Sequence, residues 1–174
     1  MSLAHLLRTF EYGQLFAFRD WPNSDVPQTT AGAYTVWRGA RLIYVGVSGR
    51  SLAEDQDAAQ RETAAKGKGL FARLNSHASG RRTGDPFCVY VADRLVLPTL
   101  SAEQIASIGA GRLSFDELVR RYIHEHLGYR FVEVADGATA RLVETEVRRG
   151  ALRAGKPLLN PLHVSIRASR PETR

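Results

Sequence analysis

Apolar positions divide the chain into helical and extended segments joined by short polar connections. Leucine and phenylalanine recur at helical spacing over residues 1–18, which predicts an amphipathic helix. Two runs rich in β-branched and aromatic residues follow at 33–37 and 42–47, and the polar turn 38–41 between them contains a glycine. Two such runs joined by so short a turn predict a β-hairpin.

The remaining segments predict further helices and strands. Helical periodicity predicts helices over residues 70–78, 102–108, 115–127 and 139–151. Continuous apolar runs predict strands over residues 87–92 and 129–134. Ser114 is placed to cap the helix that follows it, and Glu117 completes a capping box. We therefore expect an α+β fold in which a small antiparallel sheet has helices packed against it.

The length of 174 residues suits a single domain with a substantial core. The proline-containing stretch 21–27 breaks the first helical pattern and leads to the hairpin. We therefore divide the chain into an N-terminal helical extension and linker, residues 1–28, and a main domain, residues 29–174. The main domain has insertions at about 51–68 and 93–115.

The net charge of +6 is concentrated in two segments. Residues 61–82 carry six basic side chains and one acidic one, and residues 141–174 carry eight basic and three acidic ones. Each segment therefore has a charge of +5, which leaves −4 for the rest of the chain. This asymmetry is expected of a protein that presents a basic face to phosphates, and a basic surface that is merely solvated is the alternative.

Composition also bears on the compartment. No run approaches 18 consecutive apolar residues, and the first residues lack the basic and long apolar regions of a secretory signal. The single cysteine, Cys88, lies inside an apolar run, which favours a buried small hydrophobe and excludes an intramolecular disulfide. We therefore expect a cytoplasmic protein without a membrane segment.

The hairpin carries two triplets that combine glycine with tyrosine, Gly-Ala-Tyr at 32–34 and Tyr-Val-Gly at 44–46. A hairpin would place Tyr34 and Tyr44 on adjacent strands, near enough for both phenol groups to serve one site. The pair of triplets resembles the signature of the GIY-YIG nuclease superfamily. Alanine and valine replace the two isoleucines of that signature, and both replacements keep an apolar strand residue.

The resemblance implies a phosphodiester hydrolase in which further residues join the two tyrosines. In this family they are a helical arginine, a helical glutamate that binds one divalent metal ion, and an asparagine near the end. Hydrolysis of a phosphodiester needs an activated water, positive charge near the phosphate and help for the leaving oxygen. Each of these side chains can be placed in this sequence.

Arg73 is similar to the family's arginine in its place on the second helix, and His77 follows four residues later. That spacing puts both side chains on one helical face. Arg50 is nearer to the hairpin in the sequence but precedes any helical pattern, so we prefer Arg73. A surface arginine is the alternative for Arg73.

Many relatives carry a lysine directly after the second triplet, where this chain has Val47. Without this lysine, the sequence is similar to a restriction-type branch of the GIY-YIG superfamily. In that branch, a histidine four residues after the arginine cooperates with the first tyrosine. A tyrosine with a pKa of about 10 is a poor base at pH 7, and a histidine that accepts its proton makes the pair workable. The resemblance therefore pairs Tyr34 with His77.

Two glutamates on the predicted last helix compete for the metal position. Val143 and Val147 mark the apolar arc of this helix. Glu144 falls on that arc, whereas Glu146 points roughly 160° away from it. A carboxylate on the core-facing side is costly unless it is compensated, and a metal ion would compensate it. We assign the metal to Glu144; a pairing with a neighbouring arginine is the alternative for either glutamate.

Asn160 lies in a Pro-x-x-Asn sequence that resembles the closing element of the family, where the asparagine steadies the site through hydrogen bonds. An asparagine before a proline is also an ordinary turn residue. Its position after the other expected residues extends the resemblance over residues 32–160, which is nearly the whole domain.

The resemblance and the charge together predict a DNA endonuclease that uses one Mg²⁺ or Mn²⁺ ion. Tyr34, helped by His77, would activate the attacking water, and Tyr44 would help to hold the water and the surroundings of the metal. Arg73 would stabilise the charge on the phosphate, and Asn160 would brace the site.

Six basic residues are expected to contact the nucleic acid, namely Lys68, Arg81, Arg82, Arg148, Arg149 and Lys156. RNA is the alternative substrate, and a basic binding module with a vestigial nuclease site is the alternative function. A homodimer that cuts both strands is an alternative to a monomer. The sequence contains no separate DNA-recognition motif and does not predict a cleavage site.

Overall fold

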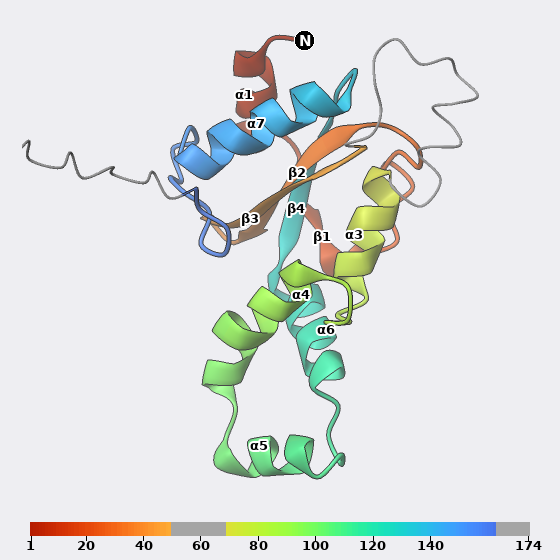
Figure 1. Ribbon diagram of the computed structural model, residues 1–174, viewed down its shortest axis with the longest axis vertical. Helices are drawn as coiled ribbons and strands as arrows, with labels where there is room; N and C mark the ends of the chain where they lie inside the picture. Colours follow the sequence, from red (N-terminus) through yellow and green to blue (C-terminus); the bar gives the residue numbers. More distant parts are fainter. Residues whose placement is uncertain (50–68, 163–174) are drawn as a thin grey trace, which may run out of the picture.

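The computed structural model describes residues 1–49 and 69–162. These residues form six α-helices and a four-stranded antiparallel sheet with the strand order β1-β4-β2-β3, which confirms the predicted α+β fold (Figure 1). The strands are Phe16–Ala17 (β1), Gly32–Arg38 (β2), Arg41–Ser48 (β3) and Gly128–Glu133 (β4). The helices are Leu3–Tyr12 (α1), Leu70–Ala78 (α3), Pro86–Val91 (α4), Ala102–Gly109 (α5), Phe115–His126 (α6) and Gly137–Arg149 (α7).

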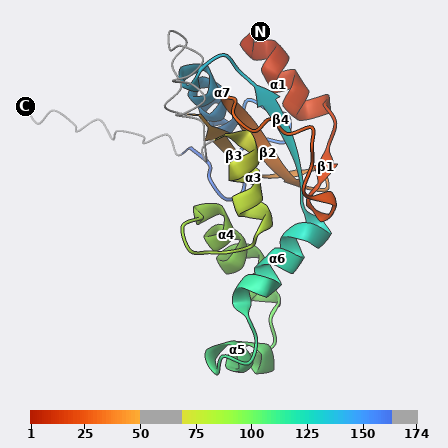
Figure 2. The same ribbon diagram turned by 90° about the vertical axis from the view of Figure 1, so that its right-hand side faces the viewer.

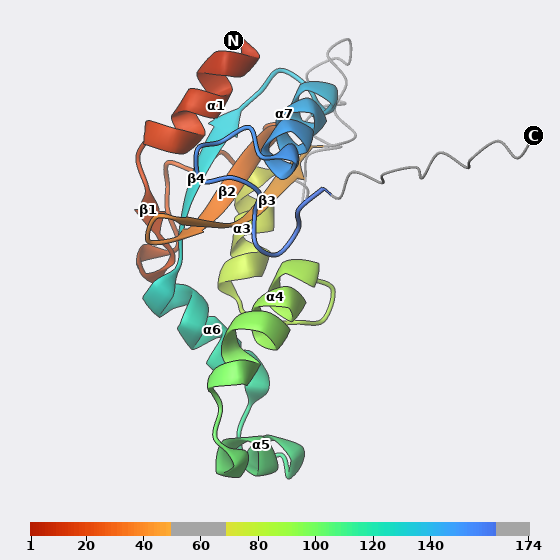
Figure 3. The same cartoon turned by 90° about the vertical axis from the view of Figure 1, so that its left-hand side faces the viewer.

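Helices cover both faces of the sheet, so the fold has two hydrophobic clusters. On one face lie α1 and α7, and Leu6 and Phe10 of α1 pack there with Val143 and Val147 of α7 (Figures 1 and 3). On the other face lies α3, whose Leu74 belongs to a cluster that also includes residues of α4 and α6. The sheet thus separates the helix that carries Glu144 from the helix that carries Arg73 and His77.

The segment predicted as an insertion at 93–115 forms an arm that extends away from the sheet. A π-helical turn over Ala92–Val96 (η2) continues α4, α5 crosses the tip, and α6 leads the chain back to the sheet (Figure 2). The predicted helix 102–108 is confirmed as α5, which begins with a capping box between Ser101 and Gln104. Within α5 no residue is buried, so the tip of the arm adds little to the core.

The strand predicted over residues 87–92 is wrong, because this segment is the helix α4 followed by η2. Asp85 caps the helix by accepting a hydrogen bond from the backbone N–H of Phe87, and Pro86 fits its first turn, where no N–H is needed. The buried positions continue at helical spacing to Leu95 and Val96. Capping and this longer periodicity therefore outweigh the strand preference of the short apolar run.

The helix predicted over residues 1–18 is too long. It ends at Tyr12, and Phe16 and Ala17 form the edge strand β1, which pairs with β4 through Phe16 opposite Tyr129. Gly13, which follows the helix, has an extended backbone, and the chain then leads to β1. Residues 1–28 therefore supply both core residues and a strand to the same sheet as the hairpin.

The other predicted elements are confirmed within one or two residues at their ends. Ser114 caps α6 by accepting a hydrogen bond from Glu117 N, and the left-handed Gly150 ends α7. The predicted capping box is not completed, because the Glu117 carboxylate lies 3.9 Å from Arg120 Nη1 instead of bonding back to Ser114 N. Cys88 is buried, as predicted. None of the helices in the described residues is both long and apolar enough to cross a bilayer. The predicted insertion 51–68 lies outside the described residues.

Candidate active site

Tyr34 and Tyr44 lie side by side on one face of the hairpin, as the sequence predicts. β2 and β3 pair antiparallel, with Tyr34 opposite Gly46 and Val36 opposite Tyr44. Both rings therefore belong to the cluster on the α3 face, and their centroids are 6.4 Å apart. Tyr34 is buried, whereas Tyr44 is partly exposed.

The glycines of the two triplets provide space that this arrangement needs. A Cβ atom at Gly46 would collide with the phenol group of Tyr34, and one at Gly32 would collide with the side chain of Leu70. Gly46 therefore lets the Tyr34 hydroxyl lie across the neighbouring strand, and Gly32 lets α3 approach β2 closely. These two close approaches give a physical reason for a glycine in each triplet.

We expect the substitution Gly46→Ala to destabilise the protein by about 1–3 kcal/mol, because the added methyl group overpacks the site. It should also move the Tyr34 hydroxyl from its place. Urea unfolding measures the first effect. Gly109→Ala is the matched control, since a Cβ there meets nothing within 4 Å and should leave stability unchanged or slightly higher. Equal stability of the two variants would contradict the close approach at Gly46.

α3 places His77 against the tyrosines. His77 is 1% exposed, and its Nε2 lies 2.7 Å from Tyr34 Oη, which is a hydrogen-bond distance. The centroid of its ring is 5.9 Å from that of Tyr44. Arg73 lies one turn earlier on α3 and is exposed, and its charge acts on both tyrosines and on His77. The structure therefore brings these four predicted residues together, while Arg50 lies outside the described residues.

Asp85 is a buried carboxylate at this site that sequence reasoning missed. It is 2% exposed, and its Oδ2 lies 2.6 Å from His77 Nδ1. Ser76 Oγ donates to the same oxygen over 3.0 Å, and Oδ1 accepts from Phe87 N over 3.1 Å. An aspartate followed by proline ahead of an apolar run is a helix N-terminus signal, and this was the available clue to Asp85.

Burial strongly disfavours ionised tyrosine at this site. Burial, followed by the negative charge that Tyr44 would carry, raises the pKa of Tyr34 well above its ordinary value. Burial and the charges of Asp85 and Glu144 raise the pKa of Tyr44 to about 12, and the positive charge of Arg73 opposes both rises. Both phenol groups are therefore protonated at neutral pH.

His77 and Asp85 form a buried pair in which the carboxylate is charged and the imidazole is neutral. Burial lowers the pKa of His77, although its hydrogen bond with Asp85 opposes this change. Burial would raise the pKa of Asp85, but the hydrogen bonds from His77, Ser76 and Phe87 N outweigh it and hold the pKa below the usual range. At neutral pH, His77 can therefore accept a proton.

Glu144 lies in α7, and its charge acts on both hairpin tyrosines although the helix covers the other face of the sheet. Glu144 is partly buried. Glu146 instead forms an ion pair with Arg149, with Oε1 and Nη1 2.7 Å apart. Of the two candidates, Glu144 is thus the glutamate whose charge reaches the tyrosines, whereas Glu146, which is also partly buried, pairs with Arg149.

The chemistry of this donor set fits an open magnesium site. The described residues contain no group of three or more histidine, cysteine or acidic side chains that could enclose a metal ion. Mg²⁺ does not need such a group, because it usually retains several waters and binds one or two carboxylates together with substrate phosphates. Glu144 provides a hard carboxylate close enough to Tyr34 and Tyr44 to influence both.

Asn160 fixes the chain after α7 to the strand that carries Tyr44. Its Nδ2 donates to Val45 O over 2.6 Å, and its Oδ1 accepts from Val45 N over 3.2 Å. Leu159 N also donates to Ile43 O over 2.9 Å, so this segment runs along β3 (Figure 3). The geometry is the one expected of a residue that braces the site.

The basic residues after α3 differ in their surroundings. Arg81 is exposed and lines a groove of about 490 Å³ together with Arg120 and His124. Arg82 is tied to Asp116 by an ion pair of 2.6 Å between Nε and Oδ1. Arg81 is therefore the better probe of nucleic-acid contact, because changing Arg82 would also break a structural pair.

The basic residues after Glu144 are also unequal. Arg148 Nε donates to Asn160 O over 3.0 Å, and Arg149 pairs with Glu146, so both have structural partners. Lys156 is exposed, and Lys68 lies outside the described residues.

No family model, curated protein or solved structure matches this chain.

Proposed function

We propose that this chain is a metal-dependent endonuclease of the GIY-YIG type that hydrolyses phosphodiester bonds in DNA. The observation that carries the proposal is the 2.7 Å hydrogen bond between Tyr34 Oη and His77 Nε2 in a buried cluster next to Tyr44. Burying polar and charged groups is unfavourable compared with packing apolar ones. A histidine and an aspartate buried beside two tyrosines therefore favour a chemical role.

The residues support a route by which a tyrosine can act as a base near neutral pH. Tyr34 would take a proton from the attacking water while its own proton passes to His77 Nε2. The raised pKa of Tyr34 makes a free tyrosinate costly, so the transfer to neutral His77 is what makes the phenol useful. Tyr44 would help to hold the water.

Positive charge near the phosphate would come from two sources. Arg73 would stabilise the charge that develops on the phosphate oxygens, for which its planar guanidinium is suited. Glu144 would hold one Mg²⁺ or Mn²⁺ ion, which supplies further charge stabilisation at the phosphate and at the leaving oxygen. The basic segments favour a polyanionic substrate.

Cleavage of supercoiled plasmid by the pure protein tests this proposal. We expect nicked or linear DNA in the presence of Mg²⁺ or Mn²⁺ and intact plasmid when EDTA removes the metal. A linear product that forms without accumulation of nicked circles would indicate that two copies cut both strands in one encounter. A folded RNA incubated in parallel separates the alternative substrate from DNA.

Two outcomes would contradict the proposal. Tight DNA binding without cleavage under any metal condition would favour a binding module with a vestigial site. Cleavage of RNA alone would reassign the substrate. A control preparation of the His77→Ala variant, purified in the same way, excludes a contaminating nuclease.

DNA binding is expected to weaken steeply as salt rises, because each neutralised phosphate releases counterions. Arg81→Glu should lower the affinity and reduce the slope of log K against log salt by about 1. Arg8→Glu changes the net charge equally but lies on α1, so it should leave the slope nearly unchanged. Fluorescence anisotropy over a salt series measures both. An affinity that stays flat from low to physiological salt would mean that the basic segments are only solvated surface.

A further inference from the structure

Asp85 holds the side of His77 that faces away from Tyr34. The two contacts use different ring nitrogens, with Nδ1 2.6 Å from Asp85 Oδ2 and Nε2 2.7 Å from Tyr34 Oη. The three side chains thus form one continuous hydrogen-bonded chain, and each of them is at most 2% exposed. Because water is largely excluded, the position of each proton among these three side chains is determined by their hydrogen bonds with one another.

We propose that Asp85 is a positioning residue that keeps the proton of neutral His77 on Nδ1, so that Nε2 is free to accept the proton of Tyr34. This inference rests on the proposed nuclease function and adds a role that the sequence did not indicate. An ionised carboxylate can only accept hydrogen bonds, so His77 Nδ1 must be the donor in this contact. The other ring nitrogen then has a lone pair, and the Tyr34 hydroxyl donates to it.

The opposite tautomer of His77 would be unfavourable for its contact with Asp85 and for its contact with Tyr34. A proton on Nε2 would leave Nδ1 and Asp85 Oδ2 as two acceptors facing each other at 2.6 Å. It would also make the imidazole donate to Tyr34 Oη, and the ring could then not receive the phenol proton. The same logic applies to serine hydrolases, where a carboxylate fixes the tautomer of the catalytic histidine.

Helix capping alone does not explain Asp85. Its Oδ1 serves the cap by accepting from Phe87 N, while Oδ2 accepts from His77 Nδ1 and Ser76 Oγ. Cys88 Sγ also lies 3.6 Å from Oδ2. Serine, threonine or asparagine can cap a helix nearly as well, but only a carboxylate offers an acceptor to the cap and another to the histidine.

Each proton that moves during hydrolysis has a donor and an acceptor. As the water oxygen bonds to phosphorus, one water O–H bond breaks and its proton goes to Tyr34 Oη. The Tyr34 proton moves to His77 Nε2, and the P–O bond to the leaving group breaks with its electron pair on the leaving oxygen, which takes a proton from solvent. The ionised Asp85 stabilises the resulting imidazolium through Nδ1–H, and once the product has left, the extra proton of His77 returns to Tyr34 Oη as the Tyr34 proton passes to a water molecule in the vacated site.

The substitution Asp85→Asn gives a sharp test, because asparagine retains the cap but not the second acceptor. The side-chain amide should keep its oxygen on Phe87 N and turn its NH₂ group toward His77 Nδ1, which forces the proton onto Nε2. Long-range ¹H–¹⁵N NMR of the metal-free protein reports the tautomer directly. We expect Nδ1–H in the wild type and Nε2–H in the variant, with plasmid cleavage reduced at least about 100-fold.

The pH profile separates positioning from a structural role. Loss of the carboxylate removes a group that favours charged His77, so the acidic limb of cleavage should move to lower pH in Asp85→Asn. The other groups that face His77 are Tyr34 from β2, Tyr44 from β3, Arg73 from α3 and Cys88 from α4, and the substitution leaves them in place. A purely structural defect would lower the rate without moving the limb.

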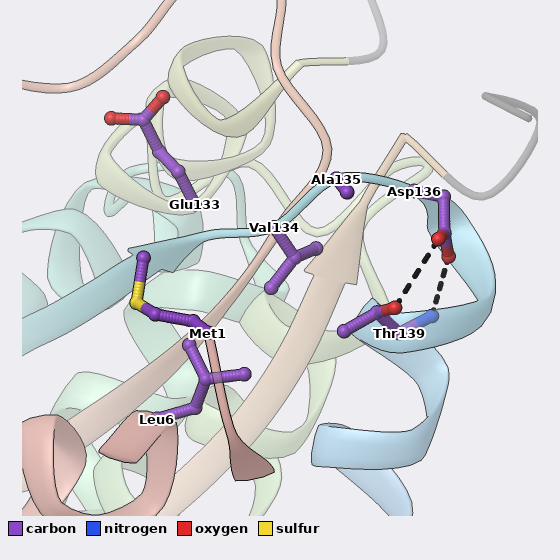
Figure 4. Close-up of a pocket in the computed structure, with 7 residues that line it drawn as sticks. All are labelled: Met1, Leu6, Glu133, Val134, Ala135, Asp136 and Thr139. Atoms are coloured by element: carbon purple, nitrogen blue, oxygen red, sulfur yellow. Dashed lines mark hydrogen bonds between the residues drawn. The ribbon is translucent and has the colours of Figure 1, made fainter. Parts of the chain in front are cut away.

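Asp136→Asn is the matched control. Asp136 caps α7 by accepting a hydrogen bond from Thr139 N over 2.6 Å and another from Thr139 Oγ1 (Figure 4). It borders a pocket of about 330 Å³ whose lining does not include His77, Tyr34 or Asp85. This variant should keep the wild-type tautomer, rate and pH profile.

An Nε2–H tautomer in the wild type, or an unchanged tautomer in Asp85→Asn, would overturn the role of Asp85. Because the NMR measurement needs no metal or DNA, it decides on Asp85 even if the wild type fails to cut plasmid. That failure would instead reject the proposed nuclease function.

Discussion

Replacement of Glu144 by glutamine is expected to reduce plasmid cleavage by at least about 100-fold while DNA binding stays intact or becomes tighter. Glutamine has nearly the same size but lacks the charge that would hold a divalent metal ion. Loss of that ion would remove charge stabilisation that is typically worth several kcal/mol in the transition state. Loss of a negative charge next to the phosphate would not weaken binding.

Glu146→Gln is the control, because it lies two residues away on the same helix. Its ion pair with Arg149 is partly exposed to solvent, and such pairs contribute little to stability. We expect wild-type cleavage from this variant. Cleavage rates are compared at saturating DNA over a Mg²⁺ titration, and circular dichroism checks folding. Equal losses in both variants would contradict the assignment of the metal to Glu144.

The elements that carry the candidate site could be predicted from the sequence because their patterns are local. The hairpin follows from two β-rich runs around a short turn, and α7 follows from a helical period over more than three turns. The spacing of four residues between Arg73 and His77 was enough to place both on α3. The Tyr34–His77 contact was predicted through the family resemblance.

The segment 87–92 was mispredicted because six consecutive apolar residues have no period of their own. The information that decides for a helix lies on either side of the run, in the cap at Asp85 and in the buried positions up to Val96. The N-terminal error has a similar origin. Phe16 fits the helical period, but pairing with Tyr129 of β4, more than a hundred residues away, makes it a strand residue.

The role of Asp85 could not be predicted from the sequence because it depends on tertiary packing. The turn between α3 and α4 brings its carboxylate back to His77, eight residues earlier in the chain. A local pattern shows an N-cap at this position, but it does not show what the second carboxylate oxygen contacts. The effect of the partly buried Glu144 on Tyr34 also depends on tertiary packing, because it requires α7 to cross the sheet near the hairpin.

The substitution His77→Ala is expected to lower cleavage by at least the roughly 100-fold that is typical of a general base. Tyr34→Phe should be equally damaging, because the phenol and the imidazole would transfer one proton in sequence. The double variant should be scarcely worse than either single variant, since residues that act as a unit are not additive. Single-turnover cleavage at saturating DNA measures all three.

The cleavage rate is expected to depend on pH through the protonation of His77. His77 must be neutral to accept a proton, so wild-type cleavage should fall as pH drops through the pKa of His77, which burial holds below 6.5. The neighbouring groups do not titrate in that window. The pKa values of Tyr34, Tyr44 and Cys88 are raised, mainly by burial, and the pKa of Asp85 is lowered.

The stability of the folded protein should also fall as pH falls, so unfolding has to be distinguished from a loss of catalysis. Since the pKa of His77 is lower in the folded than in the unfolded protein, the unfolded state binds more protons below about pH 6.5, and folding weakens there as pH falls. Thermal unfolding at each pH identifies the range in which the protein stays folded. Within that range, the residual cleavage by His77→Ala should lack the acidic limb. A variant that cuts at the wild-type rate with an unchanged limb would rule out the Tyr34–His77 mechanism and leave Tyr44 as the candidate base.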